Sequence, residues 1–182
     1  MNAGGRGMIC TNHYECALEA YLKDRGIPYL AVCEKRRART GIPYDPPFKS
    51  PDFLLSPPEN EAWIAEVKGR RFSSRNGYWK HWTTWDDLIG LRRWESLFGS
   101  RFKGLLVFAY EICGSCSPLP EEQLYTYRRR RYGFVAMELE RYIPEIHLIS
   151  IRWNTYAMPT GRFRQLAKPF EEFLFRRKNG GH

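Results

Sequence analysis

The spacing of apolar residues predicts an amphipathic helix near the N-terminus. Between Asn12 and Arg25, apolar residues recur at intervals of three and four, so they share one face of a helix. Gly26 follows at the position where a glycine commonly ends a helix. The apolar face consists of Tyr14, Ala17, Leu18, Tyr21 and Leu22.

Three strand-like segments come next, at residues 27–34, 52–55 and 62–70. An irregular basic segment with several prolines, ending at Ser50, separates the first from the second. The second and third are rich in apolar, β-branched and aromatic residues and are joined by a short turn. These two segments are therefore expected to pair as a hairpin.

The rest of the chain predicts a second helix and further strands. Thr84 and Asp87 have the spacing of a helix start, and Gly99 ends the helical pattern. The later segments are a buried strand at 103–111, a polar insertion at 113–131, two strands that extend the sheet at 132–139 and 147–153, and a closing helix at 162–175 that Pro169 kinks or divides.

This order of elements predicts an α/β domain in which helices flank a mixed β-sheet. The core has the order αβββαβ and is followed by C-terminal strands and a helix. A length of 182 residues and an apolar content of 43% suit one domain with a sizeable core, at residues 12–176. Residues 1–11 and 177–182 are expected to be a flexible N-terminus and a flexible tail.

Candidate chemistry lies in the predicted hairpin. Side chains two positions apart on a strand share a face, so Glu66 and Lys68 point the same way while Val67 points into the core. Pairing of the two strands would bring Asp52 to the same place. Two carboxylates there suit Mg²⁺, or Mn²⁺ in its place, because these cations prefer oxygen ligands. The carbonyl of Val67 is a further candidate ligand.

This set of groups suits the hydrolysis of a phosphodiester bond. A bound metal would polarise the phosphoryl oxygen and make a coordinated water more acidic. Lys68 would position the attacking water or neutralise charge in the transition state. The alternative is structural, with Glu66 and Lys68 on the solvated face of an edge strand.

With the first helix included, the chain resembles the PD-(D/E)xK nuclease superfamily. The resemblance, over residues 12–111, rests on charged residues in the superfamily's order: Glu15 in a first helix, then Pro51-Asp52, then Glu66-Val67-Lys68. It implies the restriction-endonuclease-like fold of type II restriction enzymes and archaeal Holliday-junction resolvases. It also implies a metal-dependent nuclease in which Glu15 completes or supports the metal site, and a homodimer by analogy with the resolvases.

The segment around Glu15 carries a narrower resemblance and an alternative interpretation. Residues 13–19, with the sequence HYECALE, resemble the signature of the HYExAFE family, although Leu18 replaces its phenylalanine. This narrower resemblance implies nothing about activity. In the structural alternative, Asn12 and Glu15 form a capping box, in which the glutamate bonds back to the Asn12 amide.

The charge of the chain indicates an anionic partner. Its 29 lysines and arginines against 20 acidic residues give a net charge of +9, and the expected partner is nucleic acid, taken to be DNA. The candidate phosphate-binding residues lie in basic clusters: Arg36, Arg37, Arg39, Arg70, Arg71, Lys80, Arg129 and Arg130. The cluster at 128–131 also fits a solvated hairpin end. The aromatic segment 78–82 fits base stacking or, as favoured here, packing on the core.

The cysteines predict no disulfide framework, because their number, five, is odd and the Gly-rich start lacks the apolar core of a signal peptide. Cys113 and Cys116 have the spacing of zinc ligands. A structural zinc needs four ligands and no second pair occurs, so a plain loop is favoured. No apolar run approaches the roughly 20 residues that span a bilayer. A cytoplasmic protein without a membrane partner is expected.

Three functions fit these observations. The favoured one is a Mg²⁺-dependent DNA endonuclease. The alternatives are a non-catalytic nucleic-acid-binding module on the same fold and a subunit of a larger DNA-processing complex. A pure binding module gains nothing from carboxylates close to phosphates, and this favours the nuclease.

Overall fold

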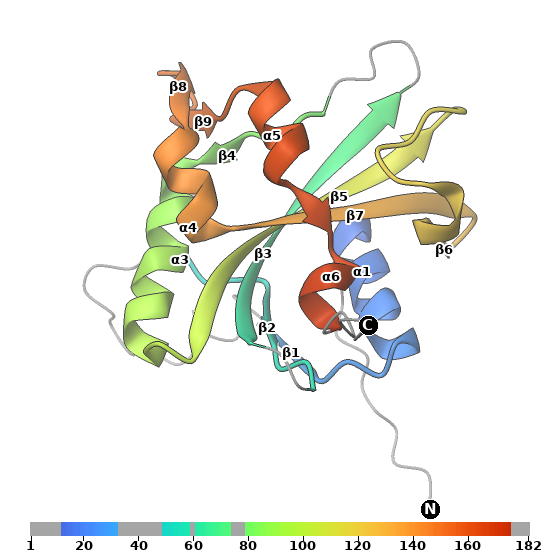
Figure 1. Ribbon diagram of the computed structural model, residues 1–182, viewed down its shortest axis with the longest axis horizontal. Helices are drawn as coiled ribbons and strands as arrows, with labels where there is room; N and C mark the ends of the chain where they lie inside the picture. Colours follow the sequence, from blue (N-terminus) through green and yellow to red (C-terminus); the bar gives the residue numbers. More distant parts are fainter. Residues whose placement is uncertain (1–11, 33–48, 59–60, 74–78, 176–182) are drawn as a thin grey trace, which may run out of the picture.

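The computed structural model describes residues 12–32, 49–58, 61–73 and 79–175. The predicted flexible N-terminus and tail lie outside these residues. The elements, shown in Figure 1, are α1 (His13–Asp24), β1 (Tyr29–Ala31), β2 (Phe53–Leu55), β3 (Ala62–Ser73), β4 (Thr83–Thr84), α3 (Trp85–Phe98), β5 (Phe102–Cys113), β6 (Tyr125–Tyr127), β7 (Arg130–Glu138), α4 (Leu139–Tyr142), β8 (His147–Ser150), β9 (Thr155–Ala157), α5 (Thr160–Leu166), β10 (Lys168–Pro169) and α6 (Glu171–Leu174).

A mixed sheet forms the centre of the fold. In the described part of the chain its strand order is β1-β2-β3-β5-β7-β10, and β6 pairs with β7. β3 and β5 run parallel over their whole lengths, whereas β1, β2 and β3 form an antiparallel series. The chain between β3 and β5 contains α3, as expected for a crossover between parallel strands. The predicted mixed sheet flanked by helices is therefore confirmed.

The two faces of the sheet belong to two separate cores. Ala65 and Val67 of β3 lie in a core with residues of α1 and α6. Ile64 lies in the opposite core, with residues of α3, α4 and α5. Because side chains alternate along a strand, Glu66 and Lys68 point to the face that α3 covers. Val67 points into the core, as predicted.

The helix ends are set by short-range contacts that the sequence indicated. The Asn12 side chain caps α1 by accepting from the Tyr14 N–H, and Gly26 follows with a φ of 64°. Thr84 and Asp87 form a complete capping box at the start of α3. None of the helices in the described residues is both long and apolar enough to cross a membrane.

One prediction for the C-terminal half is wrong. Residues 147–153 do not extend the main sheet, because β8 pairs with β9 and β9 with β4 in a separate sheet of three strands. The closing helix predicted at 162–175 is divided at Pro169, one of the two expected outcomes, into α5 and α6. Between them, Lys168 and Pro169 pair with the edge of β7, a position that tolerates proline because an edge residue needs no N–H on its outer side.

Gly69 allows α1 to lie directly on β3. A Cβ atom at this position would overlap the aromatic ring of Tyr14, in the first turn of α1. Glu15 is the next residue in that turn. The position of Glu15 relative to β3 therefore depends on the absence of a side chain at residue 69.

Gly69→Ala is expected to lower the free energy of unfolding by about 1–3 kcal/mol, because the added methyl group must displace the Tyr14 ring. Gly161→Ala is the matched control, since a Cβ there has no neighbour within 4 Å. The control should be unchanged or slightly more stable, because alanine favours a helix over glycine. Denaturant unfolding measures both variants. Equal stability of the two would contradict this contact.

Candidate active site

The candidate site lies where β2 separates from β3. The pairing of the two strands ends at Phe53 opposite Ala65, and the Asp52 N–H still donates to the Ala65 carbonyl at 3.0 Å. At the next step along β3, the Val67 N–H donates to Oδ2 of the Asp52 side chain at 2.7 Å. The Asp52 carboxylate thus takes the place of a backbone carbonyl as the acceptor for the Val67 N–H. Because no strand in the described residues covers the edge of β3 at this point, side chains from both faces of the sheet can reach it.

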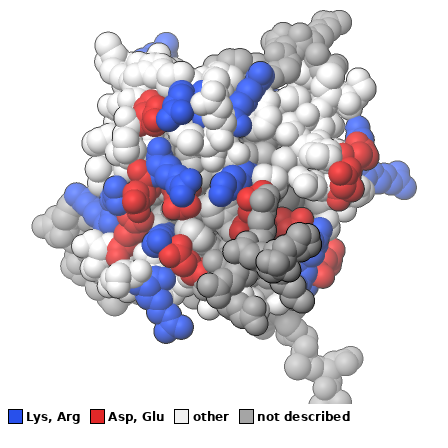
Figure 2. Space-filling view, in the orientation of Figure 1, with Lys and Arg blue, Asp and Glu red and all other residues white. Residues whose placement is uncertain are grey.

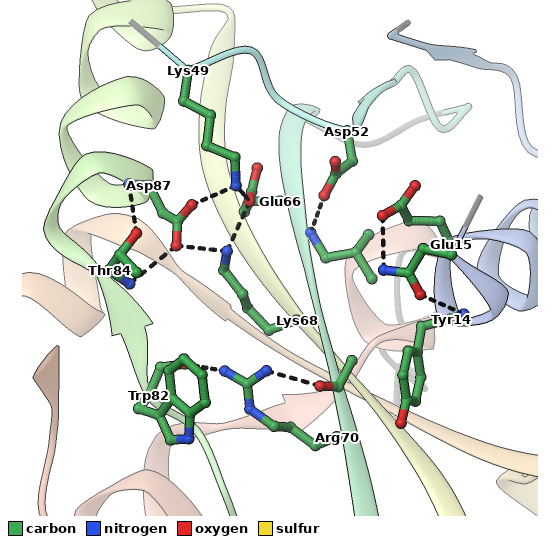
Figure 3. A pocket seen from close by; sticks show the side chains of 13 residues that line it. Tyr14, Glu15, Lys49, Asp52, Glu66, Lys68, Arg70, Trp82, Thr84 and Asp87 are labelled. Atoms are coloured by element: carbon green, nitrogen blue, oxygen red, sulfur yellow. Dashed lines mark hydrogen bonds and ion pairs between the residues drawn. The ribbon is translucent and has the colours of Figure 1, made fainter. Parts of the chain in front are cut away.

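A cavity of about 380 Å³ occupies this opening (Figure 3). Its walls come from the start of α1, the segment before β2, the middle of β3 and the start of α3. The lining residues are Asn12, Tyr14, Glu15, Lys49, Asp52, Glu66, Val67, Lys68, Gly69, Arg70, Trp82, Thr84 and Asp87. The structure therefore brings the four predicted catalytic residues, and the candidate ligand Val67, to one place.

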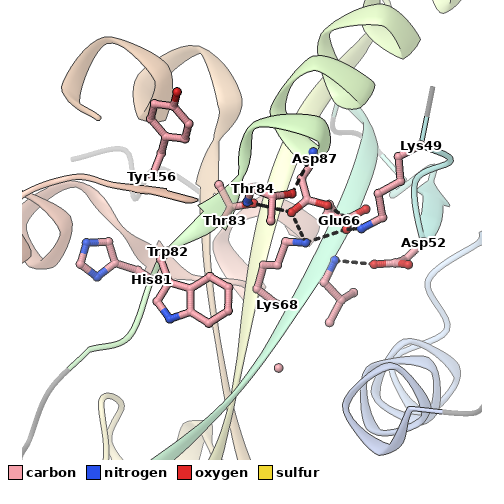
Figure 4. Close-up of polar contacts among 12 residues, drawn as sticks. Lys49, Asp52, Glu66, Lys68, His81, Trp82, Thr83, Thr84, Asp87 and Tyr156 are labelled. Atoms are coloured by element: carbon pink, nitrogen blue, oxygen red, sulfur yellow. Dashed lines mark hydrogen bonds and ion pairs between the residues drawn. The ribbon is translucent and has the colours of Figure 1, made fainter. Parts of the chain in front are cut away.

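Two lysines and two carboxylates form a closed ring of ion pairs in this cavity (Figure 4). The Nζ atom of Lys68 lies 2.8 Å from Oε1 of Glu66 and 2.6 Å from Oδ2 of Asp87. The Nζ atom of Lys49 contacts the same two carboxylates. The carboxylates are nearly fully buried, whereas the side chains of Lys68 and Lys49 are 11% and 37% exposed. Lys49 thus forms the outer, solvent-facing member of the ring.

Three carboxyl groups of the cavity are unfavourably placed as anions. Burial raises the pKa of Glu66 to about 7, and the nearby Asp52 adds to this although Lys68 opposes it. Burial likewise raises the pKa of Asp52 to about 6. The hydrogen bond from the Val67 N–H lowers this pKa, whereas the nearby Glu15 raises it further. Burial also raises the pKa of Glu15. A cation bound among these groups would favour their ionised forms.

Asp87 behaves in the opposite way. Burial alone would raise its pKa, but Lys68 and Lys49 outweigh burial and hold the pKa of this carboxyl well below its usual range. The Thr83 hydroxyl and the Thr84 N–H also donate to Oδ2 of Asp87, at 2.9 and 3.0 Å. Its place at the start of α3 further favours negative charge. Asp87 is therefore a fixed anion that holds both lysines.

Helix α3 also fixes the backbone of Lys49. The indole N–H of Trp94 donates to the Lys49 carbonyl at 3.0 Å. A Cβ on Gly90 would lie 3.0 Å from the same oxygen, so a side chain there would press on this segment. Sequence reasoning missed Lys49, whose only signal was a basic residue shortly before Asp52. It recognised Asp87 only as part of a helix start.

Glu15 lies beyond Asp52 as seen from Glu66 (Figure 3). Its Oε1 accepts a hydrogen bond of 2.9 Å from the side-chain amide of Asn12. The predicted capping box placed this bond on the backbone amide of Asn12, whereas the observed bond goes to its side chain. Asn12 in turn caps α1. The N-cap residue therefore positions the Glu15 carboxylate at the cavity.

The oxygen donors of the cavity suit a hard divalent cation. The N–H and C=O of a strand residue point to the same edge, so the Val67 carbonyl faces the opening in which Asp52 lies. In the described residues, no three His, Cys, Asp or Glu side chains form a metal site by themselves. A set of Asp52, Glu66 and the Val67 carbonyl fits Mg²⁺ or Mn²⁺, since Mg²⁺ in particular keeps several waters among its ligands.

Among the described residues, Arg70 is the predicted phosphate-binding residue that lines the cavity. Its guanidinium carbon is 3.8 Å from the centroid of the Trp82 ring, and its N–H groups donate to the carbonyls of Gly69 and Trp82. Burial lowers its pKa. The guanidinium is therefore held at the rim of the cavity, beside an exposed indole.

The other basic candidates that the structure describes are on the surface, outside the cavity lining. Arg71 and Arg130 both pair with Glu111, at 3.9 and 3.1 Å, and Lys80 is exposed. Arg129 lies in the turn between β6 and β7 with a φ of 61°, which confirms a hairpin end at this cluster. In Figure 2, Lys and Arg are interspersed with Asp and Glu on the face shown. The candidates Arg36, Arg37 and Arg39 lie outside the described residues.

In the described part of the chain, Cys113 and Cys116 have no further potential metal ligands beside them. Cys113 ends β5, and Cys116 is exposed in the loop that follows. No group of three or more potential ligands includes them there. The absence of a metal from this segment therefore stays a prediction.

Comparison with known proteins identifies a fold relative. No protein-family model matches the chain, and no curated protein matches it. Among solved structures, the chain is similar to Hjc, a Holliday junction resolvase from the archaeal hyperthermophile Archaeoglobus fulgidus. The TM-score is 0.51 at 13% sequence identity, and the match covers 90% of this chain and 98% of the resolvase chain. The fold is therefore resolvase-like. The resemblance to the HYExAFE family stays a prediction.

Asp87→Asn is expected to lower the free energy of unfolding at pH 7 by about 3 kcal/mol, because it leaves two lysines with one fewer carboxylate. The pKa of Asp87 is lower in the folded chain than in the unfolded chain. Its stabilising effect is therefore present above about pH 4 and is lost as the pH falls further. Urea unfolding should show a deficit at pH 7 that narrows at pH 3.

Asp86→Asn is the matched control for this experiment. Asp86 is the preceding residue of the same helical turn and its side chain is exposed. Its loss should change stability by less than about 0.5 kcal/mol. A similar loss of stability in both variants would show that the effect comes from negative charge at the start of α3 rather than from the ring of ion pairs.

Proposed function

We propose that this chain is a metal-dependent endonuclease that hydrolyses phosphodiester bonds of DNA. The observation that carries the proposal is the meeting of four residues around one cavity: Glu15, Asp52, Glu66 and Lys68. The PD-(D/E)xK resemblance assigns catalysis to the same four residues. The resolvase-like fold of the chain also supports the proposal.

Mg²⁺ is the proposed cofactor, with Mn²⁺ as an alternative. Asp52, Glu66 and the Val67 carbonyl would hold it, and Glu15 would support the site. When bound, the metal would polarise the phosphoryl group and make a coordinated water more acidic. Carboxylates outnumber cations among the lining residues, and Arg70 directs its guanidinium toward Trp82. An added divalent cation would therefore relieve the repulsion between buried carboxylates.

Lys68 is the proposed group that acts on the nucleophile. An ammonium has three N–H donors, and its contacts with Glu66 and Asp87 account for two of them. The third would donate to the attacking water or to a phosphate oxygen, and would stabilise the charge of the transition state. Because two carboxylates hold the ammonium in place, little reorganisation is needed during the reaction.

Lys49 is proposed to contact the phosphate from the solvent side. It is the more exposed lysine of the ring, and its partners Glu66 and Asp87 raise its pKa although burial opposes them. A permanent cation at the mouth of the cavity would attract the DNA backbone. Its contacts with the site carboxylates would restrain it close to the scissile phosphate.

The substrate class is proposed from charge and fold. Arg70, Arg71, Lys80, Arg129 and Arg130 are the proposed backbone contacts among the described residues. The fold relative is named as a Holliday junction resolvase, so branched DNA belongs among the substrates to be tested. A homodimer is proposed by the same analogy.

The proposal is tested by cleavage of labelled linear duplex, single-stranded DNA, a four-way junction and RNA. Each is incubated with Mg²⁺, with Mn²⁺ or with EDTA. The wild type is expected to cut at least one DNA substrate in a metal-dependent way. Lys68→Ala should reduce the rate about 100- to 1,000-fold, as expected for loss of a group that stabilises transition-state charge. Asp52→Asn should abolish cleavage.

Lys103→Ala is the control variant, because Lys103 pairs with Glu61 and does not line the cavity. It should cut at the wild-type rate. Cleavage that persists in EDTA would contradict the metal-dependent mechanism, and a wild-type rate in Lys68→Ala would contradict the role of Lys68. Binding of DNA by the folded wild type, without cleavage under any condition, would favour the alternative of a binding module.

A further inference from the structure

The aromatic segment before β4 has two different environments. The ring centroid of Trp79 lies 5.9 Å from that of Phe163. The His81 ring stacks on the same Phe163 ring, with 4.2 Å between the centroids. Trp82, by contrast, is 39% exposed and turns toward the cavity. The expected packing on the core therefore holds for Trp79 and His81, and Trp82 is left to face solvent.

A second cavity, which we call the aromatic pocket, adjoins Trp82. Its volume is about 360 Å³, and it is lined by Trp82, Thr84, Ile149, Trp153 and Thr155. Trp82 and Thr84 also line the candidate active site. In Figures 3 and 4, Trp82 lies on one side of Lys68 and Asp52 on the other. The two cavities are therefore neighbours that share Trp82 and Thr84 as lining residues.

The turn that carries Trp153 is anchored to α3. The Trp85 N–H, at the first residue of α3, donates to the carbonyl of Asn154 at 3.0 Å, and Asn154 adopts a positive φ of 46°. The Trp153 N–H donates to the Ser150 hydroxyl at 3.3 Å. The backbone is thus held in place while the Trp153 side chain remains 66% exposed. An exposed indole on a fixed turn is a ready stacking surface.

Cations flank both indoles of the pocket. The guanidinium carbon of Arg70 lies 3.8 Å from the Trp82 ring centroid, and that of Arg152 lies 5.1 Å from the Trp153 ring centroid. Flat aromatic walls bind nucleobases by stacking, and neighbouring cations bind the attached phosphates. The pocket therefore has both features of a site for a single nucleotide within a strand.

We propose that the aromatic pocket binds an unpaired nucleobase of the DNA strand whose phosphodiester bond enters the active site. This inference rests on the proposed function, because the shared walls place the base next to the scissile phosphate. Bases of an intact duplex are paired and stacked on their neighbours, so they are not available to the pocket. The preferred substrate is then DNA with an unpaired nucleotide at the cleavage position.

The test is a binding measurement in EDTA, which separates recognition from cleavage. A fluorescein-labelled 15-nucleotide single strand is compared with the duplex of the same sequence by anisotropy, at one salt concentration. Trp153→Ala should weaken single-strand binding about 5- to 150-fold, the range for loss of one base–aromatic stack, and leave duplex binding unchanged. Trp153→Tyr should restore most of the affinity, because tyrosine also stacks.

Ile151→Ala is the matched control, since Ile151 is the more exposed residue of the same turn and does not line the pocket. It should bind both DNAs like the wild type. Unchanged single-strand binding in Trp153→Ala, or an equal loss for both DNAs, would overturn the proposal. Sedimentation that shows a wild-type dimer and a Trp153→Ala monomer would also overturn it, because a second copy would then occupy the pocket.

The result also separates this inference from the nuclease. If the protein cleaves DNA in a metal-dependent way but Trp153→Ala binds single strands like the wild type, the proposed base-binding role of the aromatic pocket is wrong and the proposed nuclease activity stands. Trp153-dependent binding of single strands without any cleavage would support the pocket and reject the nuclease.

Discussion

The hydrogen bond from the Val67 N–H to the Asp52 carboxylate is the interaction on which the candidate site depends. Continued pairing of β2 with β3 would satisfy that N–H with a backbone carbonyl and close the edge of the strand. The carboxylate instead satisfies the donor and lets the chain of β2 turn away. Only at such an opening do α1, from one face of the sheet, and α3, from the other, reach the same cavity.

The opening places carboxylates in a poorly solvated environment, and the rest of the site compensates for this. On the α3 face, Lys68 and Lys49 neutralise Glu66, and Asp87 keeps both lysines in place. On the α1 face, the side-chain amide of Asn12 donates a hydrogen bond to the Glu15 carboxylate. Asp52 lies between these groups with a raised pKa. This asymmetry is the reason for proposing a bound cation at Asp52 and Glu66 and for proposing that the lysines contact the substrate.

The sequence predicted those parts of the fold that depend on local patterns. The apolar spacing of α1, the Thr84–Asp87 capping box and the alternation along β3 are local signals, and all three are confirmed. Strand pairing beyond neighbours is not local, so β8 was assigned to the wrong sheet. The role of Lys49 depends on Trp94 and Gly90, which lie more than 40 residues away along the chain. No spacing rule connects such residues, and only the fold brings them together.

Soaking crystals of the protein in Mn²⁺ tests the central claim most directly, because anomalous scattering locates the ion without reference to activity. The account predicts one strong peak bounded by the carboxylates of Asp52 and Glu66 and the carbonyl of Val67. The peak should be missing from crystals of Asp52→Asn treated in the same way. Saturating Mn²⁺ without a peak at this strand edge, or with an equal peak in the variant, would contradict the claim that the opened edge of β3 is a metal site.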